Sequence, residues 1–338
     1  MKIPTTVIGS FPHLEPEPLC QQLLQNLSLP AWPQLPRRSF KENMYVQYSA
    51  RLPGIRLDEQ DEKVYFDTSN DLAEELEAFY APIVEEDVQA FALPEARAAG
   101  YYAMRELLAR HKPAQVKGQV TGPLSLGLTV TDHNLRASLY DANLADAIVK
   151  NSAFCARWQV RDLKQVAPEV LLFVDEPYMA SFGSAYIQIS REQVIEMLDE
   201  VFLAIQQEGG RAGVHCCGNT DWPVLMATRV DVLNLDAVSH LESLALYPAE
   251  LLAFLERGGQ VAWGIVPNTE AALETAAATI QDELARGLNS IAERARNMDL
   301  PLTVNRLLEQ SLLTPACGLG SSSEKVAERV LDLLSRLG

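Results

Sequence analysis

The chain has 338 residues, of which 48% are hydrophobic, 7% aromatic and 22% charged. This ordinary globular composition excludes a disordered, collagen-like or coiled-coil protein. Its 28 Lys and Arg residues against 45 Asp and Glu residues give a formal net charge of −17. Nucleic acid, which requires a basic surface, is therefore not an expected partner.

Short apolar runs that favour β-strands alternate with longer helical patterns along the chain, as in βα units with a parallel sheet. The sequence predicts eight strands, at Thr5–Ile8, Val88–Ala92, Gln115–Thr121, Val170–Val174, Arg211–His215, Val232–Leu235, Val261–Ile265 and Ser311–Pro315. Predicted helices include Glu95–His111, Leu139–Val166, Arg191–Glu208, Glu242–Arg257, Thr269–Asn297 and Ser323–Leu337. Eight such units predict a single α/β domain over residues 1–338, a closed (β/α)8 TIM barrel. A doubly wound open sheet is the alternative, but no Gly-x-Gly-x-x-Gly motif follows an early strand.

The connection after the first predicted strand, residues 11–87, is far longer than a usual βα loop. It contains the segment Trp32–Gly54. Long structured insertions at the top of a barrel often cover the functional site. We therefore expect an arm over the barrel top, or an arm that packs on the rim or on a second subunit.

Residues that bind metal ions stand at three of the predicted strand ends. His215-Cys216-Cys217 follows the fifth strand, Asp236 ends the sixth and Cys317 follows the eighth. Barrel enzymes build their sites at this face. Side chains alternate along an extended backbone, so His215 and Cys217 point the same way and Cys216 points toward the helices. One imidazole, two thiolates and one carboxylate suit tetrahedral Zn²⁺, whereas Mg²⁺ and Ca²⁺ prefer oxygen ligands.

These residues also have structural interpretations. His215 and Cys217 can be neighbouring core residues, and Asp236 can cap the loop after its strand. Cys20 and Cys155 lie inside predicted helices, where a cysteine usually acts as a small hydrophobic side chain. Five thinly spread cysteines indicate reduced thiols and hence a cytoplasmic protein. No signal peptide or membrane-spanning stretch is evident, and no membrane partner is expected.

A resemblance to a known family rests on five short motifs in chain order: Ile8-Gly9-Ser10-Phe11-Pro12, Thr121-Gly122-Pro123, Val174-Asp175-Glu176-Pro177, His215-Cys216-Cys217-Gly218 and Pro315-Ala316-Cys317-Gly318-Leu319. The chain resembles the catalytic C-terminal half of cobalamin-independent methionine synthase, and more loosely the thiol methyltransferases of the uroporphyrinogen decarboxylase superfamily. The resemblance implies a (β/α)8 barrel and a zinc ion held by His215, Cys217, Asp236 and Cys317. The family has Glu where this chain has Asp236. Full-length members carry an additional N-terminal half, and this chain is expected to begin at the catalytic half.

The resemblance also implies a site for an amino acid. The backbone of Ile8, Gly9 and Ser10 would bind the carboxylate of homocysteine, and Asp175 would bind its ammonium group. This division agrees with the need for donors at one end and a carboxylate at the other. Asp175 and Glu176 are the expected catalytic residues, with Glu176 either supporting Asp175 or contacting the methyl donor. A simple turn is the structural alternative for Asp175-Glu176-Pro177.

The expected activity is zinc-dependent transfer of a methyl group to a thiol, with homocysteine giving methionine as the leading case. A free thiol has a pKa of about 8.5, so little thiolate is present at neutral pH. Zinc can deprotonate the acceptor sulfur and hold it. Two protein thiolates and a carboxylate leave the metal electron-rich, which favours alkyl transfer over hydrolysis.

The expected donor is methyltetrahydrofolate or methylcobalamin, the latter free or carried by a corrinoid protein partner. Arg37, Arg38 and Lys41 form a basic cluster that would clamp the anionic groups of such a donor, or would be ordinary solvated charge. Three alternatives remain: transfer to another thiol such as coenzyme M, a metal-free uroporphyrinogen decarboxylase-like enzyme, and a non-enzymatic structural zinc site or thiol-binding module.

Overall fold

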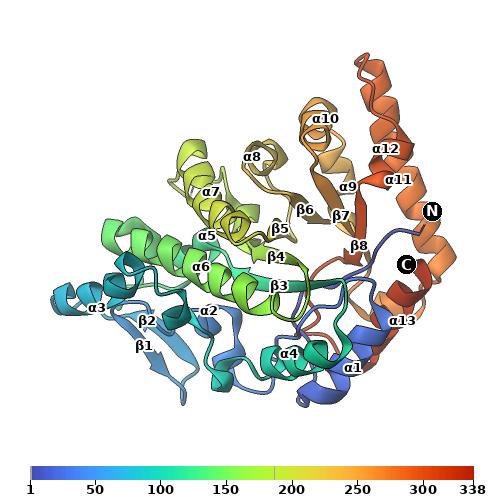
Figure 1. Ribbon diagram of the computed structural model, residues 1–338. Coiled ribbons are helices and arrows are strands. Elements are labelled where there is room, and N and C mark those ends of the chain that lie inside the picture. Colours follow the sequence, from blue (N-terminus) through green and yellow to red (C-terminus); the bar gives the residue numbers. More distant parts are fainter. Residues whose placement is uncertain (1, 186) are drawn as a thin grey trace.

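The structure is a computed structural model that describes residues 2–185 and 187–338. Its main sheet is parallel and curved (Figure 1), and each strand pairs with the next one in the chain. The strands of this sheet are β3 (Gln115–Thr121), β4 (Glu169–Asp175), β5 (Arg211–Cys216), β6 (Val232–Asp236), β7 (Gln260–Val266) and β8 (Ser311–Pro315). A separate antiparallel pair consists of β1 (Ile55–Asp58) and β2 (Lys63–Phe66).

Helices fill the connections between the strands. They are α1 (Pro16–Asn26), α2 (Met44–Gln47), α3 (Ala73–Val84), α4 (Ala99–His111), α5 (Pro123–Thr129), α6 (Ala142–Leu163), α7 (Arg191–Gln207), α8 (Trp222–Ala227), α9 (Ala237–Leu244), α10 (Pro248–Glu256), α11 (Ala277–Asn297), α12 (Val304–Glu309) and α13 (Glu324–Leu337). Helices α6, α7, α8 and α10 follow one another along the outer side of the sheet (Figure 1). None of the helices in the described ranges has the length and apolar character that crossing a membrane requires.

The limits of the longer helices follow from their capping residues. Helix α7 begins after Ser190, whose hydroxyl accepts a hydrogen bond from Gln193 N while the Gln193 side chain accepts one from Ser190 N. This reciprocal pair satisfies two of the free amides at a helix start. The helix stops before Gly209, which has a φ of 75° that favours glycine. The predicted helix Arg191–Glu208 is therefore confirmed to within one residue at its end.

The predicted closed barrel of eight strands is wrong. The main sheet has six strands and ends at β3 on one side and β8 on the other. Together with the small β1–β2 sheet it forms a mixed α/β architecture, in which the parallel strands make a half-barrel. Six of the eight predicted strands are present, and the two that fail are the first two in the chain.

The second predicted strand, Val88–Ala92, is instead a 3-10 helix over Val88–Phe91. Asp87 starts this turn, because its carboxylate accepts a hydrogen bond from Ala90 N at 3.3 Å. The apolar residues face the core as a strand would: Val88 and Phe91 are both buried. Hydrophobicity alone therefore does not separate a short buried turn from a short buried strand.

The first predicted strand, Thr5–Ile8, makes only one bridge, from Thr5 to Leu313 of β8. Beside it, Pro30 O accepts a hydrogen bond from Lys117 N of β3 at 2.8 Å. Extended chain therefore lies against both edges of the sheet without forming regular strands there. Pro4 and Pro30 cannot donate backbone hydrogen bonds, which limits the ladder that either segment can form.

The long connection between residues 11 and 87 is part of the core as well as of the surface. It contains α1, α2, α3 and the β1–β2 pair. Trp32 is fully buried within it, and its Nε1 donates a hydrogen bond to Gln159 Oε1 of α6 at 3.0 Å. The segment Trp32–Gly54 is thus anchored to α6 through a buried residue.

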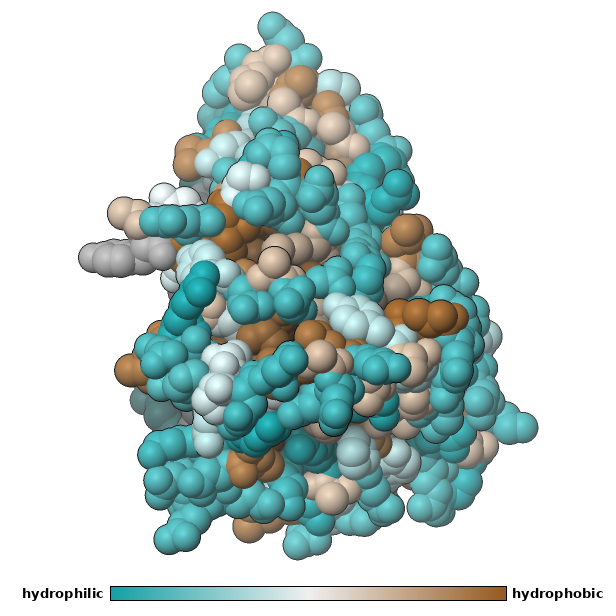
Figure 2. Space-filling view, turned by 90° about the vertical axis from the view of Figure 1, so that its left-hand side faces the viewer, coloured by the Kyte–Doolittle hydropathy of each residue, from teal (hydrophilic) through white to brown (hydrophobic). Residues whose placement is uncertain are grey.

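The core lies mainly between the sheet and the outer helices. Trp263 of β7 belongs to it, fully buried with its Nε1 donating a hydrogen bond to Ser311 Oγ. A smaller cluster fills the inside of the curved sheet: Ile8, Leu29, Leu171, Phe173, Val232, Ala262 and Leu312. The face shown in Figure 2 is largely hydrophilic, with hydrophobic residues in separate patches.

Candidate metal centre

Three of the predicted ligands come together at the carboxyl ends of the strands. His215 lies near the end of β5, Cys217 follows β5 and Cys317 follows β8. The ligand atoms of these residues all lie within 4.8 Å of one another, and His215 Nε2 is 3.7 Å from Cys317 Sγ. Within residues 2–185 and 187–338 this is the one group of His, Cys, Asp or Glu side chains that meets this criterion.

Cys216 points away from this group, as the alternation along the strand predicts. Its side chain is fully buried, and its Sγ lies 3.4 Å from Gly218 O. Burial raises its thiol pKa to about 12. Cys20 and Cys155 are also buried, with pKa values raised by burial to about 12. These three cysteines are structural thiols.

Asp236 is not part of the cluster. Its carboxylate accepts a hydrogen bond from Ser239 N at 3.0 Å and so caps the first turn of α9. Asp236 therefore acts as a cap, which is the structural alternative given for it in the sequence analysis. With Asp236 turned to the helix, the group offers three protein ligands, and a tetrahedral ion would keep one position for another molecule.

Asn234 orients the histidine of the cluster. Its Nδ2 donates to Ala262 O at 2.7 Å and to Thr314 Oγ1 at 2.9 Å. A carbonyl oxygen can only accept, so Oδ1 of Asn234 is the atom 2.5 Å from His215 Nδ1. His215 therefore carries a proton on Nδ1, and Nε2 is the nitrogen that faces Cys317 and can bind a metal.

The sequence interpretation missed Asn234. The signal is its position in β6: its backbone lies beside His215 in the register of β5 and β6. A buried amide inside an otherwise apolar strand requires partners on its own face of the sheet.

The charges of the cluster are interdependent. Hydrogen bonds from Cys317 and His215 lower the pKa of Cys217 to about 4. The same contact with Cys217, together with burial, raises the pKa of Cys317. Burial lowers the pKa of His215, but Cys217 and Asp175 raise it by more. These contacts favour the thiolate form of Cys217.

Asp175 lies next to the cluster at the end of β4, where its backbone pairs with His215. Burial raises the pKa of its carboxyl to about 6, while His215 and Lys117 act in the opposite direction. Its Oδ1 is buried and has no hydrogen-bond partner among the described residues. An unpaired buried carboxylate oxygen beside a cavity is a place for a ligand donor.

Glu176, the second predicted catalytic residue, is turned toward α5. Its Oε1 accepts from Leu124 N at 3.0 Å, and its Oε2 accepts from Ser125 N at 2.7 Å and Ser125 Oγ at 2.6 Å. A side chain at Gly122 would come within 2.1 Å of this carboxylate. The Thr121-Gly122-Pro123 and Asp175-Glu176-Pro177 motifs therefore fit one another, with Glu176 anchoring the start of α5 and holding β4 in place.

Two of the three predicted substrate-binding residues, Ile8 and Ser10, line a cavity together with the cluster, and Gly9 is not among the lining residues. Gly9 has a φ of 153°, and a side chain there would come within 2.7 Å of Gln119. Ser10 O accepts from Leu319 N at 2.8 Å, so this segment also positions the loop that carries Cys317.

A cavity of about 470 Å³ joins these groups. Its lining comprises Ile8, Ser10, Gln34, Pro36, Arg37, Asn43, Met44, Asp175, Pro177, His215, Cys217, Cys317, Gly318, Gly320 and Ser321. Five of these residues, from Gln34 to Met44, belong to the segment Trp32–Gly54. The segment therefore forms a wall of the cavity. This agrees with the expectation that it covers the functional site.

The three cations of the basic cluster have different surroundings. Arg38 pairs with Glu42 at 3.1 Å, and Lys41 pairs with Glu59 at 2.9 Å. Arg37 lines the cavity, and its Nη2 donates to Ser321 O at 2.9 Å. Arg38 and Lys41 are therefore ordinary paired surface charges, whereas Arg37 faces the cavity.

Lys117 of β3 is a buried cation close to the site that the sequence interpretation missed. Its Nζ donates to Ile8 O and lies 4.5 Å from the centre of the Phe173 ring. Burial lowers its pKa to about 8, and the Asp175 carboxylate acts against this. A lysine in the middle of a predicted inner strand is the signal that was available in the sequence.

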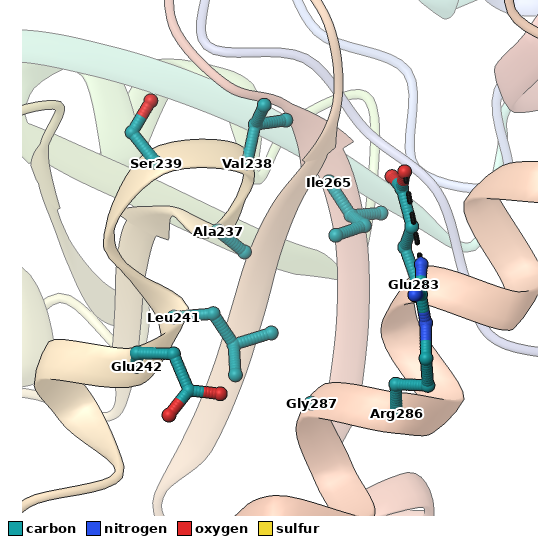
Figure 3. A pocket seen from close by; sticks show the side chains of 9 residues that line it. All are labelled: Ala237, Val238, Ser239, Leu241, Glu242, Ile265, Glu283, Arg286 and Gly287. Carbon is teal, nitrogen blue, oxygen red and sulfur yellow. Dashed lines mark ion pairs between the residues drawn. The ribbon is translucent and has the colours of Figure 1, made fainter.

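A second cavity, of about 360 Å³, lies between α9 and α11 (Figure 3). Its polar groups include Ser239, Glu242 and the pair formed by Glu283 and Arg286 at 4.0 Å. No cysteine or histidine lines it. The side chains that can carry metal or thiol chemistry are thus in the first cavity.

The arrangement of His215, Cys217 and Cys317 can hold a metal ion. One imidazole nitrogen, Nε2, and two sulfurs converge within 4.8 Å, and the cavity gives small molecules access to them. A comparison of the chain with models of protein families finds no match, and a comparison with curated proteins finds none either.

Proposed function

We propose that the protein is a zinc-dependent methyltransferase that transfers a methyl group to a thiol, with homocysteine as the acceptor and methionine as the product. The observation that carries the proposal is the convergence of His215, Cys217 and Cys317 on a cavity that also contains the unpartnered carboxylate oxygen of Asp175. Reduced thiols at this centre fit a cytoplasmic protein.

The donor set supports zinc as the metal. Two sulfurs and one imidazole nitrogen are ligands that Zn²⁺ accepts readily, whereas Mg²⁺ and Ca²⁺ prefer oxygen. Asn234 engages Nδ1 of the histidine and so turns Nε2 toward the two thiols, and such partners of a ligating histidine are typical of zinc sites. A closed structural zinc site would have four protein ligands, whereas here three ligands border a cavity.

Zinc held by these residues would lower the pKa of the acceptor thiol, so that the sulfur is present as a thiolate. Two cysteine ligands reduce the positive charge of the centre, which favours a nucleophilic sulfur over an activated water. A metal-free decarboxylase would leave Cys217 and Cys317 without a role. The charge of the ligands thus supports methyl transfer.

The residues around the centre suit an amino-acid acceptor. Asp175 offers a carboxylate oxygen without a partner among the described residues to an ammonium group, and Ser10 lines the same cavity with its backbone fixed by Leu319. Lys117 donates to the carbonyl of Ile8, which fixes the same segment. The donor in this proposal is methyltetrahydrofolate or methylcobalamin, the latter free or on a corrinoid protein.

The test is metal analysis followed by an assay. Protein purified without added zinc should contain one zinc per chain, and it should form methionine from homocysteine with one of the two donors. Cys317→Ser should lose zinc and activity and stay folded, because a serine hydroxyl is a poor zinc ligand. Cys216→Ser, at the buried neighbour that faces away, should keep the zinc.

Two results would contradict the proposal. Absence of zinc in protein kept under reducing conditions would remove the metal centre. Zinc without methionine from either donor would leave the metal and exclude this reaction.

A further inference from the structure

The residues that line the cavity differ in exposure, which gives it a buried end and an exposed end. His215 is only 3% exposed, whereas Arg37 is an exposed residue. The volume of about 470 Å³ is within the range of roughly 300–1,000 Å³ that holds drug-sized ligands. One amino acid at the metal end would leave room for part of a second molecule toward Arg37.

Arg37 has hydrogen-bond donors that the protein does not use. Its guanidinium makes one hydrogen bond, from Nη2 to the carbonyl of Ser321. Among the described residues no carboxylate lies within 4.0 Å of it. A guanidinium has five N–H donors, so most of them remain for a ligand in the cavity.

Within the basic cluster, only Arg37 lacks a counter-ion among the described residues. The neighbouring cations Arg38 and Lys41 pair with Glu42 and Glu59. The chain carries a net charge of −17, so carboxylates are abundant on its surface. The one cation of this cluster that faces the cavity is the one without a carboxylate partner.

Two more donors line the same cavity. Asn43 uses its Oδ1 to accept a hydrogen bond from Tyr45 N at 3.0 Å, which leaves its Nδ2 as a donor. Ser321 also lines the cavity, and its hydroxyl can donate. The exposed end of the cavity is therefore rich in donors and carries a positive charge.

We propose that this end of the cavity binds an anionic group of the methyl donor, a carboxylate or a phosphate, with Arg37 as its main contact. The inference rests on the proposed function and adds the chemical class of the second substrate. A guanidinium binds either group through two parallel hydrogen bonds. Methyltetrahydrofolate carries carboxylates and methylcobalamin carries a phosphodiester, so both candidate donors have the required chemistry.

The test is direct binding of the donor, measured without any acceptor thiol. Methyltetrahydrofolate and methylcobalamin are titrated calorimetrically into the zinc-loaded full chain and into Arg37→Gln, Arg37→Lys and Lys41→Gln. The donor that binds the wild-type protein should bind Arg37→Gln about tenfold more weakly or worse, which corresponds to about 1.4 kcal/mol. Arg37→Lys should lie between the two. Lys41→Gln is the matched control, because Lys41 pairs with Glu59, and its affinity should stay within about twofold of wild type.

The choice between the two donors shows which anionic group the site binds. Binding of methyltetrahydrofolate identifies a carboxylate. Binding of methylcobalamin identifies a phosphodiester, and methylcobinamide, which lacks that group, should then bind wild type and Arg37→Gln with equal, lower affinity. Added salt should weaken binding to wild type more than to Arg37→Gln.

Equal affinity of wild type and Arg37→Gln, or no binding of either donor to the wild type, would overturn the inference. Circular dichroism and zinc content show whether each variant is folded and loaded. Donor binding that depends on Arg37 without any methyl transfer would contradict the proposed function and leave the anion site in place.

Discussion

Asn234 controls which nitrogen of His215 can meet a metal ion. Its amide is held by Ala262 O and Thr314 Oγ1, so its oxygen faces the histidine. A ligating histidine usually depends on such a partner for its orientation and basicity. The residue is thus a positioning residue that acts on the centre through His215.

We expect Asn234→Leu to weaken zinc binding by roughly 10- to 100-fold, the usual effect of losing such a partner. Asn234→Asp should retain most of the affinity, because a carboxylate oxygen can still accept the proton of His215 Nδ1. Competition with a chelator of known affinity measures both variants. Equal zinc affinity in wild type and Asn234→Leu would show that the hydrogen bond is dispensable.

The residues of the centre illustrate what a sequence can indicate. His215, Cys217 and Cys317 were predictable because alternation along a strand and position at a strand end depend on local geometry. The role of Asp236 was not, because a side chain at a strand end can turn either to a metal or to the next helix. The amides at the start of α9 decide between the two.

The Asp236→Ala variant tests whether Asp236 caps α9 or binds the metal. Loss of the cap on α9 should cost about 1 kcal/mol of unfolding free energy, and zinc content should remain that of the wild type. Ser190→Ala, which removes the cap of α7, is the matched control with a similar cost. Loss of zinc in Asp236→Ala alone would identify Asp236 as a fourth ligand.

Helix α5 depends on a carboxylate whose ionisation is opposed by burial. Burial raises the pKa of Glu176 from 4.5 to about 7, although the hydrogen bonds from Ser125 and Leu124 act against this. The folded protein then holds this proton at pH values where the unfolded chain has released it. The contribution of Glu176 to stability is present below about pH 4.5 and is lost as the pH rises toward 7.

The test compares wild type with Glu176→Gln by denaturant unfolding of the metal-free protein between pH 4.5 and 8. Other titrating groups cancel in the difference between the two proteins. The unfolding free energy of wild type relative to the variant should fall by about 3 kcal/mol over this range, since one pKa unit corresponds to about 1.4 kcal/mol. A difference that does not change with pH would mean that Glu176 titrates normally.

At the level of elements, the six later strands were predictable from apolar runs bounded by turn residues. The first two predictions failed for identifiable reasons. Asp87 captures the backbone of the Val88–Phe91 turn, and prolines interrupt the extended segments near β3 and β8. Runs of apolar residues report burial, whereas the partner of each backbone amide decides between strand, turn and extended chain.

For the whole molecule, the sheet and its helices form a core that is separate from the proposed ligands. Hydrophobic residues from α1 to α13 make one large cluster. Metal removal should therefore lower stability without unfolding the chain. A centre saturated at 1,000 times its dissociation constant contributes about 4 kcal/mol.

Chelation should accordingly lower the melting temperature by about 5–10 °C and leave the far-ultraviolet circular dichroism unchanged. The Cys317→Ser variant should melt at the same temperature with and without zinc. A collapse of secondary structure on chelation would instead mean that the metal is required for folding, as in small zinc domains.

One residue of β3 holds both ends of the cavity wall. Gln119 Nε2 donates to Trp32 O at 3.1 Å, and Tyr48 donates its hydroxyl proton to Gln119 O at 2.5 Å. The residues that line the cavity from this stretch lie between these two anchors. Side chains there can change without loss of either anchor. Substrate preference can therefore diverge among proteins with this architecture while the reactive centre on the strand ends stays the same.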